Sequence, residues 1–441
     1  MSPFIEEHYY GGAKAFYNKL LEKGLLNPTC QRCGIGKVTL FFGSKEKSPR
    51  TYCKKCKAEV PSCRNGTIFD LYDIRHIPAF MFMMKCVVRR VAVESAIDLC
   101  GLDPETGRRY IEIVRTVMTH TADVLYQDWE GKLGGPGVVV EVDEAFMTES
   151  KYHVGRQLAK NDVIILGMTE REGGPTRVED VRLLQYIFEK EQSRSDEETV
   201  QHAEAFDNAL VLNRQTDPID DRVFDETTTQ VVLSDDESDD EEEPDDDEPQ
   251  QPEPQTAEPV PAGQQQTRPR FKMIPAFESA EKQLFGPKER NFPKRTVMFV
   301  VPNRRAETLI PLIRKYVKPG TFVFTDKWLA YWDLRNGYKH FVVVHKKRFV
   351  QYHFFPNQVV LKVTTNHIER IWVEMRKDLR GVKKEDIERR LREVPYRLFR
   401  LWSAKLEDRD EALMADIRAY VTDKILADSG SVFRLSRPME E

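Results

Sequence analysis

The sequence has no apolar run that approaches the roughly 18 residues of a membrane-spanning helix, so we do not expect a membrane span. The segment MSPFIEEHYY at its start lacks a basic region followed by an apolar core, so we do not expect a secretion signal. Cysteine is absent after Cys100, and all 7 cysteines lie in the first quarter of the chain. This clustering favours metal binding in a reduced compartment over a disulfide framework.

The chain has 441 residues, which is long enough for two or three domains. Basic residues are scarce in one stretch of it. Residues 191–262 contain 25 acidic and 3 basic residues, a net charge of −22. The whole chain carries −5, so the remainder carries +17. A basic body with a separate acidic segment suggests a polyanionic partner, although a solvated basic surface would have the same composition.

Two Cys-x2-Cys pairs, 19 residues apart, lie near the start of the chain. Their members are Cys30, Cys33, Cys53 and Cys56. Two thiolates on each tight turn can complete a tetrahedral Zn²⁺ site, so this spacing is typical of a zinc ribbon, which we place in residues 1–70. Cys63 lies just beyond the second pair, and Cys86 and Cys100 lie in apolar patterns; we expect none of these three to be a ligand.

Residues 71–130 have the apolar periodicity of helices, interrupted by a turn at Asp103-Pro104. Two short helices joined by a tight turn could form a helix-turn-helix, a motif that binds DNA. Arg108 and Arg109 would then contact DNA. The alternative is a helical linker domain packed on methionine and aromatic residues.

Two short β-branched stretches each end in an acid. Val138–Phe146 (VVVEVDEAF) follows a glycine-rich turn and predicts a buried strand that ends near Asp143. Gly320–Trp328 (GTFVFTDKW) predicts a second strand, which ends at Asp326. Buried carboxylates need partners or a metal, although strand-end acids are often surface groups. If the strands are parallel neighbours, both acids lie at their carboxyl ends, where α/β sheets commonly bind ligands.

A third stretch, TTNHIERIWVEMRK at residues 364–377, predicts a helix that begins near Thr365 or Asn366. Asn366 and Glu369 are three residues apart and share one helical face. Ile368 and Trp372 lie on a different, apolar face. Two strand-end aspartates and a helical glutamate would together supply the oxygen ligands that hard divalent cations prefer.

Four stretches together resemble, in their sequence and in their order along the chain, the ISXO-type insertion-sequence transposases and their eukaryotic relatives, the Merlin superfamily. They are VVVEVDEAF, VIILGMTER, VVPNRRAETLIPLIRKYVKPGTFVFTDKWLAY and TNHIERIW. The resemblance implies an RNase H-like core with a DDE triad made of Asp143, Asp326 and Glu369, with Asn366 as the rival for the third position. It also implies Mg²⁺ or Mn²⁺ as the cofactor, double-stranded DNA (transposon ends and target DNA) as the partner, and a homo-oligomer assembled on DNA.

The predicted architecture is α/β, with an RNase H-like mixed-sheet catalytic core in residues 131–171 and 295–381 and a helical region in 382–441. Residues 172–294 depart from the compact family pattern as an insertion. Within it, Asp235–Glu248 is almost wholly acidic, which predicts a disordered segment because too little apolar surface can be buried. The segment would be a solvated linker or, on the strength of its charge alone, an electrostatic mimic of DNA.

Further basic residues are candidates for DNA contacts. Lys346, Lys347 and Arg348 form a basic patch near the predicted site, for which a solvated loop is the alternative. Arg376 lies seven residues after Glu369, close to the same helical face, and could bind a DNA phosphate.

The predicted function is metal-dependent cleavage at transposon ends followed by strand transfer into target DNA. One alternative is a host-adopted zinc-ribbon protein that binds DNA without catalysis, and another is a nuclease of the same core without strand transfer. We expect a nuclear location if the host is eukaryotic.

Overall fold

The computed structural model describes residues 12–42, 49–60, 63–147, 163–194, 274–285, 294–343 and 350–428. The acidic segment Asp235–Glu248 and the basic patch of Lys346, Lys347 and Arg348 lie outside the described residues. The chain divides into two compact units. The first contains Met1–Glu172, Glu289–Val342 and Thr364–Glu441, and the second contains Gly173–Lys288 and Val343–Val363.

The first unit begins with a helix and a small antiparallel sheet that carries the cysteine pairs. These elements are α2 (Ala13–Glu22), β1 (Val38–Phe41), β2 (Arg50–Cys53) and β3 (Ala58–Glu59). The sheet order is β1-β2-β3. The first cysteine pair precedes β1, and the second begins at the last residue of β2. The hairpin therefore brings two segments that are distant in sequence to the same place.

A helical region follows, and its buried side chains form one core with the C-terminal helix. The helices are α3 (Ile68–Leu71), α4 (Ile77–Val88), α5 (Val93–Cys100), α6 (Pro104–Trp129) and α15 (Leu406–Asp428). Gly101 ends α5 in the left-handed conformation, and the Asp103 carboxylate accepts the Thr106 N–H at 2.9 Å to cap α6. The expectation of two short helices is wrong for the second, because α6 has 26 residues. Its apolar periodicity continues without a break to Trp129, so nothing ends it earlier.

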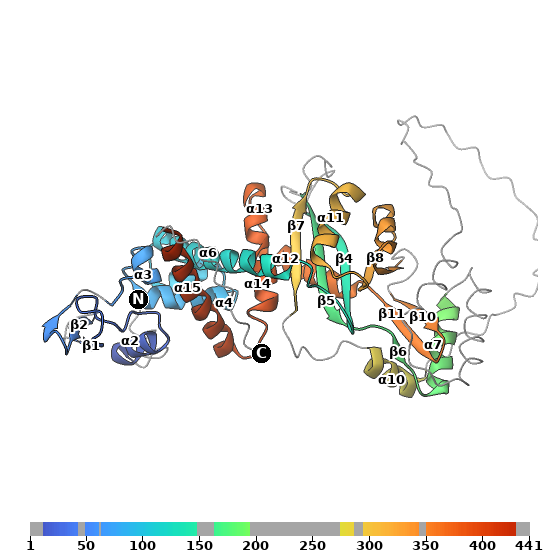
Figure 1. Ribbon diagram of the computed structural model, residues 1–441, viewed down its shortest axis with the longest axis horizontal. Coiled ribbons are helices and arrows are strands. Elements are labelled where there is room, and N and C mark those ends of the chain that lie inside the picture. The colour runs from blue at the N-terminus through green and yellow to red at the C-terminus, as the bar shows by residue number, and fades with distance from the viewer. Residues whose placement is uncertain are drawn as a thin grey trace, which may run out of the picture. The chain divides into compact units, whose positions relative to one another are not determined.

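The central sheet of the first unit has five strands in the order β7-β5-β4-β8-β9. The first four are labelled in Figure 1. The strands are β4 (Val138–Met147), β5 (Val163–Glu172), β7 (Thr296–Val301), β8 (Phe322–Asp326) and β9 (Lys339–Val343). β5 is antiparallel to both β4 and β7, whereas β8 is parallel to β4. The predictions of a mixed sheet, and of parallel neighbouring strands that carry Asp143 and Asp326, are confirmed. β8 ends at Asp326 as predicted, but the prediction that the first strand ends near Asp143 is wrong, because β4 stays paired with β5 as far as Met147.

Helices cover both faces of this sheet because strand residues alternate between the faces. α11 (Ala306–Tyr316) and the 3₁₀ helix η4 (Leu329–Arg335) share a core with Val140 and Val142. α12 (Asn366–Asp378), α13 (Lys384–Leu391) and α14 (Glu393–Phe399) share a second core with Ala145. No helix in the described parts of the chain is long and apolar enough to cross a membrane.

The second unit has its own small core. Its elements are β6 (Thr176–Arg177), α7 (Val181–Arg194), α10 (Pro275–Phe285), β10 (Gln351–Phe355) and β11 (Val359–Val363). The three strands form an antiparallel sheet in the order β10-β11-β6. A three-residue loop, Pro356 to Gln358, joins β10 to β11, and Asn357 and Gln358 in it have left-handed φ of 61° and 59°.

Candidate active site and metal centre

The parallel register of β4 and β8 brings two predicted acids together. The last paired residues are Glu141 and Phe324, and Asp143 and Asp326 each lie two residues further along. Both side chains therefore reach the same level at the carboxyl end of the sheet. Carboxylate oxygens of Asp143, Glu144 and Asp326 all lie within 4.8 Å of one another. This group, which we call the carboxylate cluster, contains two of the expected residues and one additional acid.

Glu144 is the member that the sequence pattern did not indicate. Strict alternation puts Asp143 and Glu144 on opposite faces of a strand. However, Asp326 is the last residue of β8, and its carboxylate lies close to both side chains. The Glu144 side chain is completely buried there. The only signal in the sequence was its position next to Asp143 at the end of the strand.

Arg304 provides a positive charge beside two of these acids. Its Nε and Nη2 atoms each donate to a Glu144 carboxylate oxygen at 3.3 Å, and Nη2 lies 3.7 Å from Oδ2 of Asp326. The guanidinium also stacks 4.2 Å from the centroid of the Trp328 ring and 5.4 Å from that of Phe146. Burial raises the pKa of Glu144, and Arg304 opposes this shift. A guanidinium that contacts two aromatic rings thus lies beside the carboxylate cluster.

The N-terminus of α12 is fixed to β4 by a different carboxylate. Glu141 is fully buried and accepts the backbone N–H groups of His367 and Ile368, both at 3.0 Å. It also pairs with Arg171. Burial raises the pKa of Glu141, while Arg171 and the two N–H groups oppose that shift. These bonds hold the first turn of α12, which begins at Asn366, against the sheet.

One turn later, α12 contacts the carboxylate cluster directly. The indole Nε1 of Trp372 donates to Oδ2 of Asp143 at 2.8 Å. Gly167 pairs with Asp143 across the sheet, and a Cβ atom at Gly167 would lie only 2.3 Å from the Trp372 ring. Glu369 is half-buried one turn before Trp372, but it is not a member of the carboxylate cluster. Glu369 and its rival Asn366 both remain predictions.

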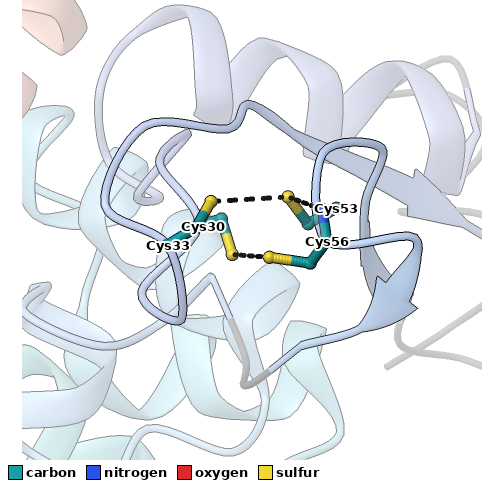
Figure 2. Close-up of side chains that lie close together, drawn as sticks. All are labelled: Cys30, Cys33, Cys53 and Cys56. Carbon is teal, nitrogen blue, oxygen red and sulfur yellow. Dashed lines mark hydrogen bonds between the residues drawn. The ribbon is translucent and has the colours of Figure 1, made fainter.

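The four paired cysteines also converge, as Figure 2 shows. The Sγ atoms of Cys30 and Cys56 are 3.9 Å apart, and so are those of Cys33 and Cys53. A Zn–S bond of about 2.3 Å in tetrahedral geometry requires S–S separations of about 3.8 Å. The four thiols therefore fit a tetrahedral Zn²⁺ site. Cys63, Cys86 and Cys100 belong instead to the helical core, where Cys86 and Cys100 were predicted to lie.

The surroundings of these thiols favour a bound cation. Backbone N–H groups of Ile35 and Gly36 lower the pKa of Cys33 to about 6. The hydrogen bond with Cys33 raises the pKa of Cys56 to about 12, because neighbouring sulfur atoms cannot all ionise without a compensating charge. A Cβ atom on Gly36 would lie 2.5 Å from the Sγ atom of Cys53, so the close approach of the two turns requires glycine.

The predicted DNA-binding residues that the structure describes lie on exposed surfaces. Arg108 pairs with Glu94, with Nη2 at 3.0 Å from Oε1, and Arg109 donates to the carbonyl of Tyr72. Arg376 is exposed near the end of α12. None of the three belongs to the carboxylate cluster, and their role as phosphate contacts remains a prediction.

Comparison with known proteins gives two matches. Residues 263–397, which include Asp326, Asn366 and Glu369, match the model of the ISXO2-like transposase domain. An uncharacterized transposase-like protein of Haemophilus influenzae is 32% identical over 102 residues, which are 22% of this chain and 76% of that protein. No solved structure matches the chain. Because the match to this relative covers 76% of its length at 32% identity, the chain belongs to the family of ISXO2-like transposases.

Proposed function

We propose that this protein is a DDE-type DNA transposase that cleaves transposon ends in a divalent-metal-dependent reaction and joins the freed strand to target DNA. The observation that carries the proposal is the convergence of Asp143, on β4, with Asp326, at the carboxyl end of the parallel strand β8. The strand order, antiparallel on one side of β4 and parallel on the other, supports an RNase H-like core. Membership of a transposase family supports DNA as the substrate.

Asp143 and Asp326 would hold Mg²⁺ or Mn²⁺, together with Glu369, Asn366 or Glu144 as the third ligand. Their oxygens suit these hard cations. When bound, a pair of such ions activates the attacking oxygen and stabilises the leaving oxygen of a phosphodiester. Trp372 fixes the orientation of the Asp143 carboxylate through its N–H bond. The four clustered cysteines would hold Zn²⁺, which would stabilise the fold of the zinc ribbon.

Double-stranded DNA would be bound by exposed basic residues. Arg108, Arg109 and Arg376 are the described candidates for phosphate contacts. We further propose a homo-oligomer assembled on DNA, and a nuclear location in a eukaryotic host. The alternative of a host-adopted, non-catalytic protein is not favoured, since Asp143 and Asp326 are both present and lie together.

The test uses the full chain, Mg²⁺ or Mn²⁺, and end-labelled duplexes carrying the repeats that flank its own genomic locus. Asp143→Asn or Asp326→Asn should reduce cleavage by more than about a hundredfold, a larger loss than supporting residues around a metal usually cause. DNA binding should be nearly unchanged. Glu307→Gln, an exposed acid on α11, is the matched control. Wild-type cleavage by either aspartate variant would reject the assignment.

The same assay identifies the third ligand. Glu369→Ala should impair cleavage more than Asn366→Ala, since a carboxylate neutralises a metal's charge and an amide does not. The reverse order would assign the role to Asn366. If Glu144→Gln is the most harmful of the three, the third ligand is in the carboxylate cluster itself. Strand joining, scored separately with a pre-cleaved end, distinguishes a transposase from a nuclease.

A further inference from the structure

A cavity of about 640 Å³ lies in the first unit, and none of its lining residues belongs to the carboxylate cluster or the cysteine site. Its walls are the end of α4, the start of α5, one face of α6, and the stretch from the end of α12 to α14. Its volume is in the range of about 300–1,000 Å³ that is typical of small-ligand sites. Nothing in the proposed reaction uses this space.

The polar side chains around the cavity are mostly basic. Eight are arginine or lysine and four are acidic. The basic residues are Arg90, Arg115, Lys377, Arg380, Lys383, Arg389, Arg390 and Arg397, and the acids are Glu112, Asp378, Asp386 and Glu393. The lining therefore carries a formal excess of four positive charges. Such an excess in a concave surface favours an anionic occupant.

At one side of the cavity a single buried carboxylate faces three arginines. Glu393 is 3% exposed, and its oxygens lie 2.6 Å from Nη1 of Arg390, 3.6 Å from Nε of Arg115 and 3.9 Å from Nη2 of Arg397. The Nε atoms of Arg115 and Arg397 are buried and have no hydrogen-bond acceptor in the described structure. Burial also lowers the pKa of both guanidinium groups. Glu112 and Asp378 also act on Arg115 and Arg397, but the two buried Nε donors still have no acceptor.

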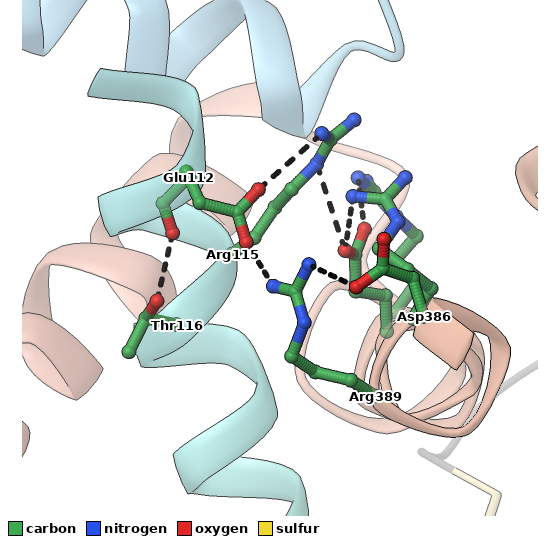
Figure 3. A network of polar contacts seen from close by, with 8 residues as sticks. Glu112, Arg115, Thr116, Asp386 and Arg389 are labelled. Atoms are coloured by element: carbon green, nitrogen blue, oxygen red, sulfur yellow. Dashed lines mark hydrogen bonds and ion pairs between the residues drawn. The ribbon is translucent and has the colours of Figure 1, made fainter. Parts of the chain in front are cut away.

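The outer part of the cavity has a second set of charges, drawn in Figure 3. Glu112 of α6 pairs with Arg389 of α13 and lies 3.8 Å from Nη1 of Arg115, while Arg389 also reaches Asp386 at 3.5 Å. In the loop between α12 and α13, Arg380 and Lys383 are exposed, and neither side chain forms an ion pair with a described residue. These two cations are therefore available to a ligand.

We propose that this cavity binds a ligand with two or more linked phosphate groups. Arg115, Arg390 and Arg397 would hold it from within, and Arg380 and Lys383 would hold it at the mouth. Phosphate oxygens suit this arrangement because they accept paired N–H donors from guanidinium groups and carry more than one negative charge. The two sources of such chemistry are a DNA backbone and a free oligophosphate.

The test measures binding of tripolyphosphate to the full chain by calorimetry, without divalent metal. Lys383→Glu should weaken binding by about tenfold or more, the effect of losing one charge-assisted contact. Lys384→Glu is the matched control, because Lys384 is the exposed neighbour and does not line the cavity. Both substitutions change the net charge by the same amount and lie on the surface, so a difference in binding between them cannot be attributed to misfolding.

A second variant should act in the opposite direction. Glu112→Gln removes the partner of Arg389 and a neighbour of Arg115, so both guanidinium groups become freer to bind phosphate. We expect tripolyphosphate to bind several-fold more tightly, because a competing ion pair at the mouth of the cavity is weakened. A residue with a purely structural role would give no gain in affinity. Unchanged or weaker binding by Glu112→Gln therefore contradicts the proposal.

Competition with fluorescent duplex DNA separates the two sources. If DNA displaces tripolyphosphate and Lys383→Glu weakens both probes more than Lys384→Glu does, the ligand is a DNA backbone. If duplex DNA and tripolyphosphate bind the protein at the same time, the ligand is a free oligophosphate. The proposal is overturned if tripolyphosphate does not bind, or if the two lysine variants behave alike. Asp143→Asn protein should bind both probes normally, so a failure here is distinct from a failure of the proposed catalysis.

Discussion

At the residue scale, Glu141 and Asp143 of β4 lie on one face of the strand but have different surroundings. Glu141 is completely buried, and its oxygens accept hydrogen bonds from Arg171 and from the backbone at the N-terminus of α12. Asp143, on the same face two residues later, is only half-buried and reaches Asp326. A carboxylate whose acceptors are all used by protein donors cannot also bind a metal well. Glu141 thus positions α12, whereas Asp143 is the residue proposed to hold a metal.

The sequence predicted Asp143 and Asp326 because a short β-branched strand that ends in an acid is a local pattern. Glu144, Arg304 and Trp372 were not predicted as parts of this site. Their roles depend on where β8, the loop before α11 and α12 meet in three dimensions, and no local pattern encodes this. For the cysteine site the spacing alone was sufficient, since two Cys-x2-Cys turns need only a hairpin to meet.

Gly36 gives a test of the cysteine site. A Cβ atom there would lie 2.5 Å from Sγ of Cys53 and 3.2 Å from Sγ of Cys33, so Gly36→Ala should push the two turns apart. We expect less than one zinc per chain by elemental analysis and a lower melting temperature, because the bound metal stabilises the ribbon. Gly34→Ala is the control; its Cβ would meet no atom within 4 Å, although its φ of 67° adds strain. A full complement of zinc in Gly36→Ala would contradict the predicted crowding.

His340 makes stability depend on pH. Burial lowers its pKa to about 4, and its Nε2 atom is 2.9 Å from the Thr325 hydroxyl, next to Asp326. An unfolded histidine has a pKa of about 6.5, so between these values the unfolded state binds more protons and stability falls as pH falls. The full shift corresponds to about 3 kcal/mol at most. His340→Gln should flatten the melting profile between pH 6.5 and 4, whereas exposed His76→Gln should not. Identical profiles for wild type and His340→Gln would count against this.

At the element scale, α12 connects the sheet to the proposed chemistry. Its first turn is bound by Glu141, and its second turn packs an indole ring on the sheet at Gly167. The helix, its start near Thr365 and its apolar face with Ile368 and Trp372 agree with the sequence prediction. The hairpin of β10 and β11 was not predicted, because Asn357-Gln358 is not a strong turn sequence and the left-handed φ of both residues is seen only in the structure.

Gly167→Ala tests the contact between α12 and β5. The added methyl group would lie 2.3 Å from the Trp372 ring, so the helix must shift away from Asp143. Overpacking of this kind costs about 1–3 kcal/mol of stability, and cleavage should fall as well because Glu369 and Asn366 move with the helix. Trp372→Phe is the comparison, since it removes the N–H bond to Asp143 but retains a ring. If Gly167→Ala cleaves DNA like wild type, the position of α12 does not matter for the reaction.

At the scale of the whole molecule, charge is distributed unevenly along the chain. Residues 191–262 carry −22 and the remainder carries +17. Of this excess, a formal +4 lines the cavity beside α12 to α14. A tethered polyanion has a high effective concentration near any basic surface of the same chain. It would compete with DNA, whose affinity depends largely on phosphate contacts.

Deleting Asp235–Glu248, which contains 12 acidic residues among 14, should therefore tighten non-specific DNA binding at low salt. The gain should shrink as salt rises, because the Debye length falls from about 30 Å at 0.01 M to about 8 Å at 0.15 M and both competitors are screened. Titration of fluorescent duplex DNA against wild-type and deleted protein at several salt concentrations measures the effect. A neutral Gly/Ser segment of the same length should behave like the deletion, since charge and not length is the cause. Equal affinities at the lowest salt would leave the segment as a solvated linker without a regulatory role.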